Sequence, residues 1–216
     1  MRRYFIISNT NTWYDLRLTL TAKDTTDPEP KTNYVELDGM SGTLDLSEAL
    51  TGEVAYSDRT VTASFWTSEG TREDRDALLR RVTAEWHGKR VQIIEPDDPD
   101  HFFVGRVKVK NVQRSLVHAA FDIEATCEPW RYALHETERL VQVNGQASVV
   151  INNSGVKSLT PSLSVTGTVS VTVNGATSKL TAGSYQITDL RLHQGVNVVA
   201  VDGKGSVTFT YREATL

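Results

Sequence analysis

The chain has 216 residues, of which 23 are basic and 27 acidic, and the resulting net charge of −4 argues against a general nucleic-acid-binding protein. Its single cysteine, Cys127, excludes an intrachain disulfide, and no stretch approaches the length of apolar sequence that a membrane span needs. The apolar run near the start has only four residues, so we expect no signal peptide and synthesis in a cytoplasm.

The first third of the chain predicts a loop, a connector and a strand. The polar, proline-punctuated segment from Ala22 to Tyr34 predicts a long exposed loop, and it is a candidate contact with another subunit or partner. The segment from Asp38 to Phe65 has glycines too widely spaced to cradle a phosphate. It ends in an alternating pattern that predicts a strand with one apolar face, formed by Val61, Ala63 and Phe65.

One helix is predicted, from Arg72 to His87. Thr71 is a good N-cap with Asp74 three residues on, and Gly88 supplies the stop. Its apolar side chains fall on one face, which predicts that the helix packs on a sheet: Leu78, Leu79, Val82 and Trp86.

Three strands are predicted to follow the helix. They run from Val91 to Glu95, from Phe102 to Val109 and from Ala120 to Cys127, and the turn from Pro96 to Asp100 joins the first two.

The composition changes near Glu136 to Leu140, so we place a domain boundary there. Residues 1–139 carry 18 basic and 24 acidic residues and all four tryptophans, whereas residues 140–216 carry 5 basic and 3 acidic residues. The second part alternates Val, Thr, Ser and Gly, with three predicted hairpin turns at Asn144-Gly145, Asn174-Gly175 and Asp202-Gly203. The predicted fold class is mainly β, with an α+β N-terminal domain (1–139) and a C-terminal β-sandwich (140–216).

No set of residues predicts an active site. The five histidines lack paired ligand spacing, and we expect His87 to stabilise the helix end. Cys127 has no base nearby in sequence, and Arg80-Arg81 has acidic neighbours that favour a solvated face. The acidic turn from Glu95 to Asp100 is the best candidate for a calcium site, yet its spacing fits no calcium loop. We therefore assign no catalytic, cofactor-binding or metal-binding residue; the other histidines considered are His101, His118, His135 and His193.

Three segments resemble the distal tail protein (Dit) family of long-tailed bacteriophages. The first lies between Gly39 and Phe65, with the distinctive core Thr43 to Leu50. The second runs from Trp86 to Ile94, continues through Pro99 to Arg106 and ends at Ala125 to Tyr132. The third comprises Asn174-Gly175, Asp189 to Asn197 and Gly205 to Arg212.

The resemblance implies a structural protein of the virion with an N-terminal belt domain and an outer β-sandwich. Members of this family form a six-fold ring between the tail tube and the adsorption apparatus, with a channel for DNA. The resemblance implies no enzymatic activity and no cofactor, and it assigns no ring-contact residues. The expected partners are further copies of the chain, a tail-tube protein and tail-tip or receptor-binding proteins, with DNA only in transit.

Two other functions are weighed against this one. A carbohydrate-binding or adhesion module needs exposed aromatic side chains, and in residues 140–216 only Tyr185 is a candidate platform, because Phe209 and Tyr211 share the apolar face of a predicted strand. A wall-degrading hydrolase would need paired carboxylates or a zinc set, and the sequence shows neither. A tail-tube or baseplate protein of a contractile phage stays open as a related structural role.

Overall fold

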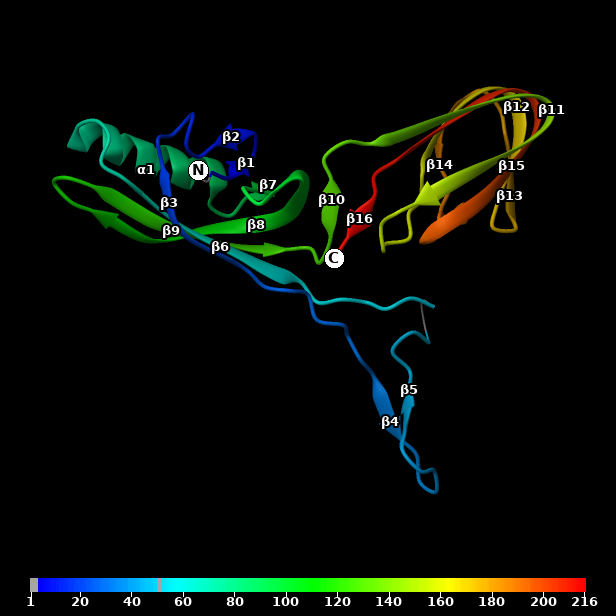
Figure 1. Ribbon diagram of the computed structural model, residues 1–216, viewed down its shortest axis with the longest axis horizontal. Helices are drawn as coiled ribbons and strands as arrows, with labels where there is room; N and C mark the ends of the chain where they lie inside the picture. Colours follow the sequence, from blue (N-terminus) through cyan, green and yellow to red (C-terminus); the bar gives the residue numbers. More distant parts are fainter. Residues whose placement is uncertain (1–3, 50–51) are drawn as a thin grey trace. The chain divides into compact units, whose positions relative to one another are not determined.

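The computed structural model describes residues 4–49 and 52–216, which divide into two compact units (Figure 1). The first ends at Pro129, with Leu216 assigned to it, and the second runs from Trp130 to Thr215. This division falls before the sequence-based boundary at residue 139, because β10 (Arg131–Ala133) pairs with β16 (Ala214–Thr215). That 1–139 and 140–216 are separate folding domains stays a prediction. Leu50, the last residue of the first motif's core, lies outside the described residues.

The first unit is built on an antiparallel sheet with the strand order β2-β1-β7-β8-β9-β6-β3. Its central strand pairs are long, and β6 and β9 alternate buried and partly buried side chains along nine residues each, with one exposed residue in each strand. The strands are β1 (Ile6–Ile7), β2 (Thr10–Asn11), β3 (Thr19–Thr25), β6 (Arg59–Thr67), β7 (Arg90–Glu95), β8 (Asp98–Arg114) and β9 (Ala119–Cys127).

The helix α1 (Arg72–Trp86) packs on this sheet, as predicted (Figure 1). Thr71 and Asp74 form a reciprocal capping box that satisfies two free N–H groups of the first turn. Trp86 is fully buried, and its ring centroid lies 6.4 Å from that of Phe121 on β9. The apolar face of β6 predicted from the sequence is also buried in this core.

The segment predicted as a loop from Ala22 to Tyr34 is partly strand. Residues 22–25 belong to β3, whose polar side chains lie at the sheet edge and so hide the usual apolar alternation. Tyr34 begins β4 (Tyr34–Glu36), which pairs with β5 (Thr43–Asp45) in a separate hairpin. The acidic turn is also shorter than predicted, because β8 begins at Asp98 and leaves only Pro96 and Asp97 between the strands.

The second unit is a single antiparallel sheet with the order β11-β15-β12-β13, and β14 pairs with β12. The sheet bends so strongly that both ends of its long strands contribute to one core, which gives the predicted sandwich its two layers (Figure 1). The strands are β11 (Thr137–Asn153), β12 (Ser162–Val173), β13 (Ala176–Leu180), β14 (Gly183–Gln186) and β15 (Gly195–Tyr211).

Two of the three predicted hairpin turns are wrong. Asn144-Gly145 and Asp202-Gly203 lie inside β11 and β15, which pair without interruption over 17 residues. The glycines there permit bending and close approach: a Cβ on Gly205 would lie 1.7 Å from the carbonyl oxygen of Thr166 on β12. Asn174-Gly175 is a two-residue hairpin turn, confirmed by positive φ values of 49° and 87°.

The buried amide of Asn197 explains part of the third motif. Its Nδ2 donates to the carbonyl oxygens of His193 and Gly195, at 2.8 and 3.0 Å. Its Oδ1 accepts from the His193 N–H and from Nδ2 of Asn174 in the hairpin turn. A side chain that is 1 % exposed and fully bonded holds two loops together, so this residue of the motif has a structural role.

Candidate interaction surface

The histidines singled out in the sequence lie apart and make local contacts. The Val109 N–H donates a hydrogen bond to Nδ1 of His87 at 3.1 Å, and His87 is the C-cap residue of α1. That His87 stabilises the helix end stays a prediction. Nδ1 of His101 lies 2.8 Å from Asp98. Among the described residues, no three His, Cys, Asp or Glu side chains gather as metal ligands, and no helix is long and apolar enough to cross a membrane.

Cys127 and the acidic turn have structural roles: the thiol is buried, and carboxylates of the turn bind other side chains of the protein. Cys127 is 1 % exposed, and burial raises the pKa of its thiol to about 12, although the Arg59 guanidinium opposes this shift. Such a thiol is protonated at neutral pH and is a poor nucleophile. In the turn, Asp97 forms an ion pair with Lys23 at 2.8 Å, and Glu95 accepts a hydrogen bond from Thr25. The carboxylates of Glu95 and Asp97 are therefore held by protein groups.

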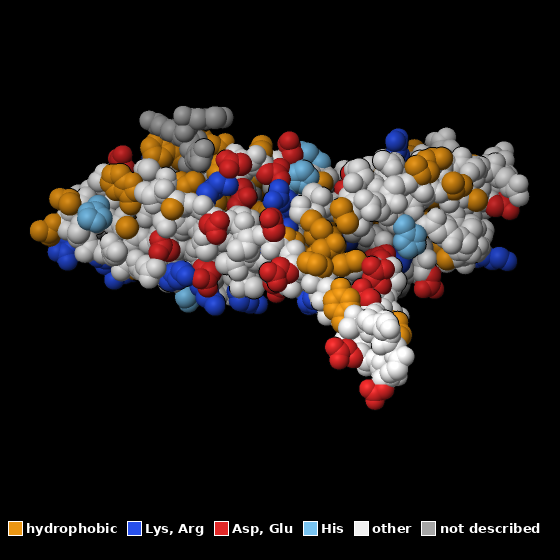
Figure 2. All heavy atoms as spheres, turned by 60° about the horizontal axis from the view of Figure 1, so that its bottom comes forward, with side chains coloured by type: hydrophobic (Ala, Val, Ile, Leu, Met, Phe, Trp, Pro, Cys, Tyr) orange, Lys and Arg blue, Asp and Glu red, His pale blue; other side chains and the backbone are white. Residues whose placement is uncertain are grey.

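The hairpin of β4 and β5, residues 34–45, stands off the sheet and is called the arm below (Figure 1). Between Tyr34 and Ala49 the sequence has four acidic residues and no basic one, and in Figure 2 acidic side chains face the viewer at the arm's tip. Four large apolar side chains of the arm are 40–57 % exposed: Tyr34, Leu37, Met40 and Leu44. A short hairpin that exposes several large apolar side chains is typical of an interaction surface.

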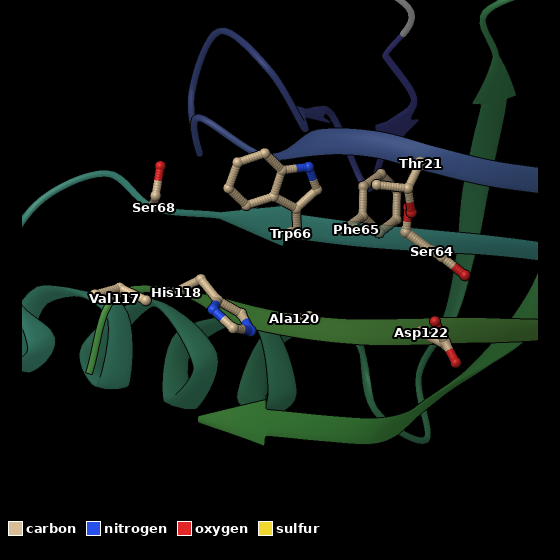
Figure 3. Close-up of a pocket in the computed structure, with 9 residues that line it drawn as sticks. All are labelled: Thr21, Ser64, Phe65, Trp66, Ser68, Val117, His118, Ala120 and Asp122. Atoms are coloured by element: carbon tan, nitrogen blue, oxygen red, sulfur yellow. The ribbon is translucent and has the colours of Figure 1, made fainter. Parts of the chain in front are cut away.

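A second exposed apolar surface lies on the open face of the first sheet, around Trp66 of β6. It is a hollow of about 640 Å³, called the Trp66 hollow, and its walls come from β3, β6, β9 and the turn between β8 and β9 (Figure 3). Val117 in that turn is 69 % exposed and lines the hollow beside His118. Polar side chains line the hollow beside the apolar ones, and this mixture is typical of a surface that contacts another protein: Thr21, Ser64, Ser68, His118 and Asp122.

Within residues 140–216, Tyr185 is the one aromatic side chain that is not buried, and it is a poor platform for a sugar. The hydroxyl of Tyr185 donates to the Thr181 carbonyl oxygen at 3.1 Å, and its half-buried ring packs against the core. A separate hollow of about 540 Å³ is lined by small and polar side chains without an aromatic one: Gln146, Ala147, Ser148, Ser170, Thr172, Ala200, Val201 and Asp202.

Sequence reasoning missed the arm and the Trp66 hollow. The arm strands have only three residues each, which is too short for a reliable alternation signal. Trp66 follows Phe65 in an alternating strand, so the pattern predicts that its side chain points away from the core. What the pattern could not give is whether another element covers that face of the sheet.

No protein-family model and no curated protein sequence matches the chain. Among solved structures, the Dit protein (gp 19.1) of phage SPP1, described as a paradigm of the hub adsorption apparatus in phages that infect Gram-positive bacteria, matches with a TM-score of 0.69. The two sequences are 14 % identical, and the match covers 99 % of both chains. Chains of two structures of the phage P2 baseplate in its activated conformation, with Ca and with Sr, align at 6 % identity with TM-scores of 0.48 and 0.47. They cover 97 % of this chain and 98 % of their own. The chain therefore has the fold of a phage Dit protein along its whole length.

Proposed function

We propose that this protein is a structural component of the tail tip of a long-tailed phage or prophage. It assembles as a ring, of six copies, that links the tail tube to the adsorption apparatus and leaves a channel for DNA. The observation that carries the proposal is the fold likeness to SPP1 Dit, which extends over both units and 99 % of each chain. The proposed location is the virion, with the tail-tube and receptor-binding proteins as neighbours.

The arm supports assembly into a ring. A closed ring uses two different patches of each subunit, one of which meets the other on the next copy. The arm offers four exposed apolar side chains on a short hairpin, and a two-stranded hairpin gains stability when it packs against another surface. We propose that the arm is one of the two patches and that the Trp66 hollow belongs to the contact surface of the unit.

The charge of the chain suits a conduit for DNA. Each copy carries a net charge of −4, so a ring of six would carry −24. Like charge between the ring and the phosphate backbone weakens adhesion of DNA during transit. The same charge opposes a function in which the protein binds DNA tightly.

We propose no enzymatic activity and no cofactor. The buried, protonated Cys127 and the dispersed histidines support a structural role. The alternative function, a carbohydrate-binding or adhesion module, would need an exposed aromatic platform, and Tyr185 is packed and hydrogen-bonded instead.

Negative-stain electron microscopy of the purified protein, alone and with its tail-tube partner, tests the proposal. We expect rings with a central opening. The double variant Leu37→Lys, Leu44→Lys should abolish the rings by placing charge on the apolar side chains of the arm. Leu140→Lys, at a residue that is more exposed and lies in the second unit, should leave the rings intact. Single copies under all these conditions would contradict the proposal.

A further inference from the structure

Strand β11 has an open edge. It pairs along all 17 residues with β15, and among the described residues no other strand pairs with it. Every second residue on the free side therefore offers backbone N–H and C=O groups to a new strand, although the Asn152 carbonyl oxygen already accepts a hydrogen bond from the Tyr211 hydroxyl at 3.2 Å. Most proteins block such an edge with charged residues, a proline or a bulge, because it can pair with another chain.

This edge has none of these blocking features over 12 residues. From Gln142 to Asn153 the sequence contains no charged residue and no proline, and the pairing with β15 shows no bulge. The core beneath the edge is incompletely covered as well. Ala147 and Val149 point into the core but stay partly exposed, whereas Ile151 on the same face is fully buried. An added strand would cover this part of the core.

The outward face beside the edge carries three exposed valines. Val150 lies directly opposite Val198 in the register of β11 and β15, and Val196 follows on the same face. Their exposed fractions are 56, 57 and 70 %, and we call them the valine patch. An exposed apolar patch next to an unpaired edge favours the addition of a strand that also has an apolar face.

We propose that β11 pairs antiparallel with β11 of a second copy of this chain, with Val150 opposite Val150. The uncharged edge is complementary to itself, because two copies bring no like charges together. Outward residues must oppose outward residues, and this register meets that condition and joins the two valine patches. The pairing also covers Val149 in both copies.

This contact goes beyond the proposed ring. A pair of β11 strands is a two-fold contact, in which a residue meets its own copy, whereas a ring closes through two different patches. The contact uses the second unit, and the arm belongs to the first. The two associations can therefore form independently, and either can fail without the other.

Disulfide trapping in the full-length chain tests the pairing. Opposed residues of antiparallel strands have Cα atoms about 4.5–5.5 Å apart, within the range that a disulfide spans. Val150→Cys should therefore give a covalent dimer under mild oxidation. Cys127 does not compete, because it is buried and burial raises its pKa to about 12. The matched control is Ser164→Cys, an exposed residue on β12, which has partner strands on both sides.

We expect at least tenfold more covalent dimer for Val150→Cys than for Ser164→Cys, both alone and after the Leu37→Lys, Leu44→Lys change that disrupts the ring. Hydrogen exchange of the unmodified protein should also show that the amides of residues 147–153 become protected as the protein concentration rises. Equal yields from the two cysteine variants would overturn the proposal. Protection of β11 that arises only when another tail protein is added would overturn it too, since the occupant would then not be a second copy.

Discussion

Arg75 in the first turns of α1 donates from Nη2 to the carbonyl oxygen of Leu116, 2.6 Å away and 41 residues later in the chain. Its Nη1 donates to the Gly70 carbonyl oxygen at 2.7 Å, and the side chain is 5 % exposed. The guanidinium thereby joins the start of the helix to the turn between β8 and β9. That turn presents Val117 to the Trp66 hollow, so Arg75 fixes one wall of a proposed contact surface.

Replacing Arg75 should loosen this turn. Arg75→Met keeps the apolar stem but removes both charged hydrogen bonds, which should lower the free energy of unfolding by about 2–3 kcal/mol. Denaturant unfolding measures the loss, and hydrogen exchange should rise at residues 115–118. Arg80→Met, on the exposed face of the same helix, is the control and should change stability by less than about 0.5 kcal/mol. Equal effects of the two substitutions would show that the Arg75 contacts do not stabilise the turn.

Gly205 and Gly175 should respond differently to substitution by alanine. Both have positive φ, so each alanine incurs backbone strain of about 1–2 kcal/mol. At Gly175 a Cβ meets open space, but at Gly205 it would lie 1.7 Å from the Thr166 carbonyl oxygen, so β12 and β15 must separate. Gly205→Ala should therefore destabilise the protein by at least about 2 kcal/mol more than Gly175→Ala, measured by urea unfolding. Similar losses would argue against close approach of the two strands.

Cys127 should make stability depend on alkaline pH. Burial raises the pKa of its thiol from the ordinary value of 9.0 to about 12, so the folded state holds its proton where the unfolded state loses it. This contribution is complete below pH 9 and is lost as the pH rises towards 12, in total about 4 kcal/mol. Urea unfolding from pH 8 to 11 should show a steeper fall for the native protein than for Cys127→Ala. Parallel curves would refute the assignment.

The second unit should not bind sugar by itself. The single candidate platform within residues 140–216, Tyr185, is hydrogen-bonded to Thr181 and packed on the core, so its ring cannot lie flat against a sugar without giving up these contacts. Calorimetric titration with host cell-wall polysaccharide should give no saturable heat. Saturable binding that Tyr185→Ala abolishes would restore the adhesion function.

The sequence predicts those elements whose signals are local. Thr71, Asp74 and Gly88 together predict the bounds of the helix. Strict alternation predicts the buried face of β6. The turn predicted at Asn144-Gly145 is wrong because the dipeptide that makes a tight turn also permits a bend within a long strand. Only the pairing of Gly145 with Gly203 in the structure distinguishes the bend from the turn. The open edge of β11 and the exposure of Trp66 depend on what neighbouring elements leave uncovered, which no local pattern contains.

Light scattering of the full-length protein at high concentration is the most direct test of the ring. One copy has a mass of 24.0 kDa, so a ring of six predicts a species of about 144 kDa. A β11 contact between rings would raise the mass further, to multiples of that value. A mass of 24.0 kDa at every protein and salt concentration, with the tail-tube partner present as well as absent, would contradict the proposal that this chain is a ring-forming component of a phage tail.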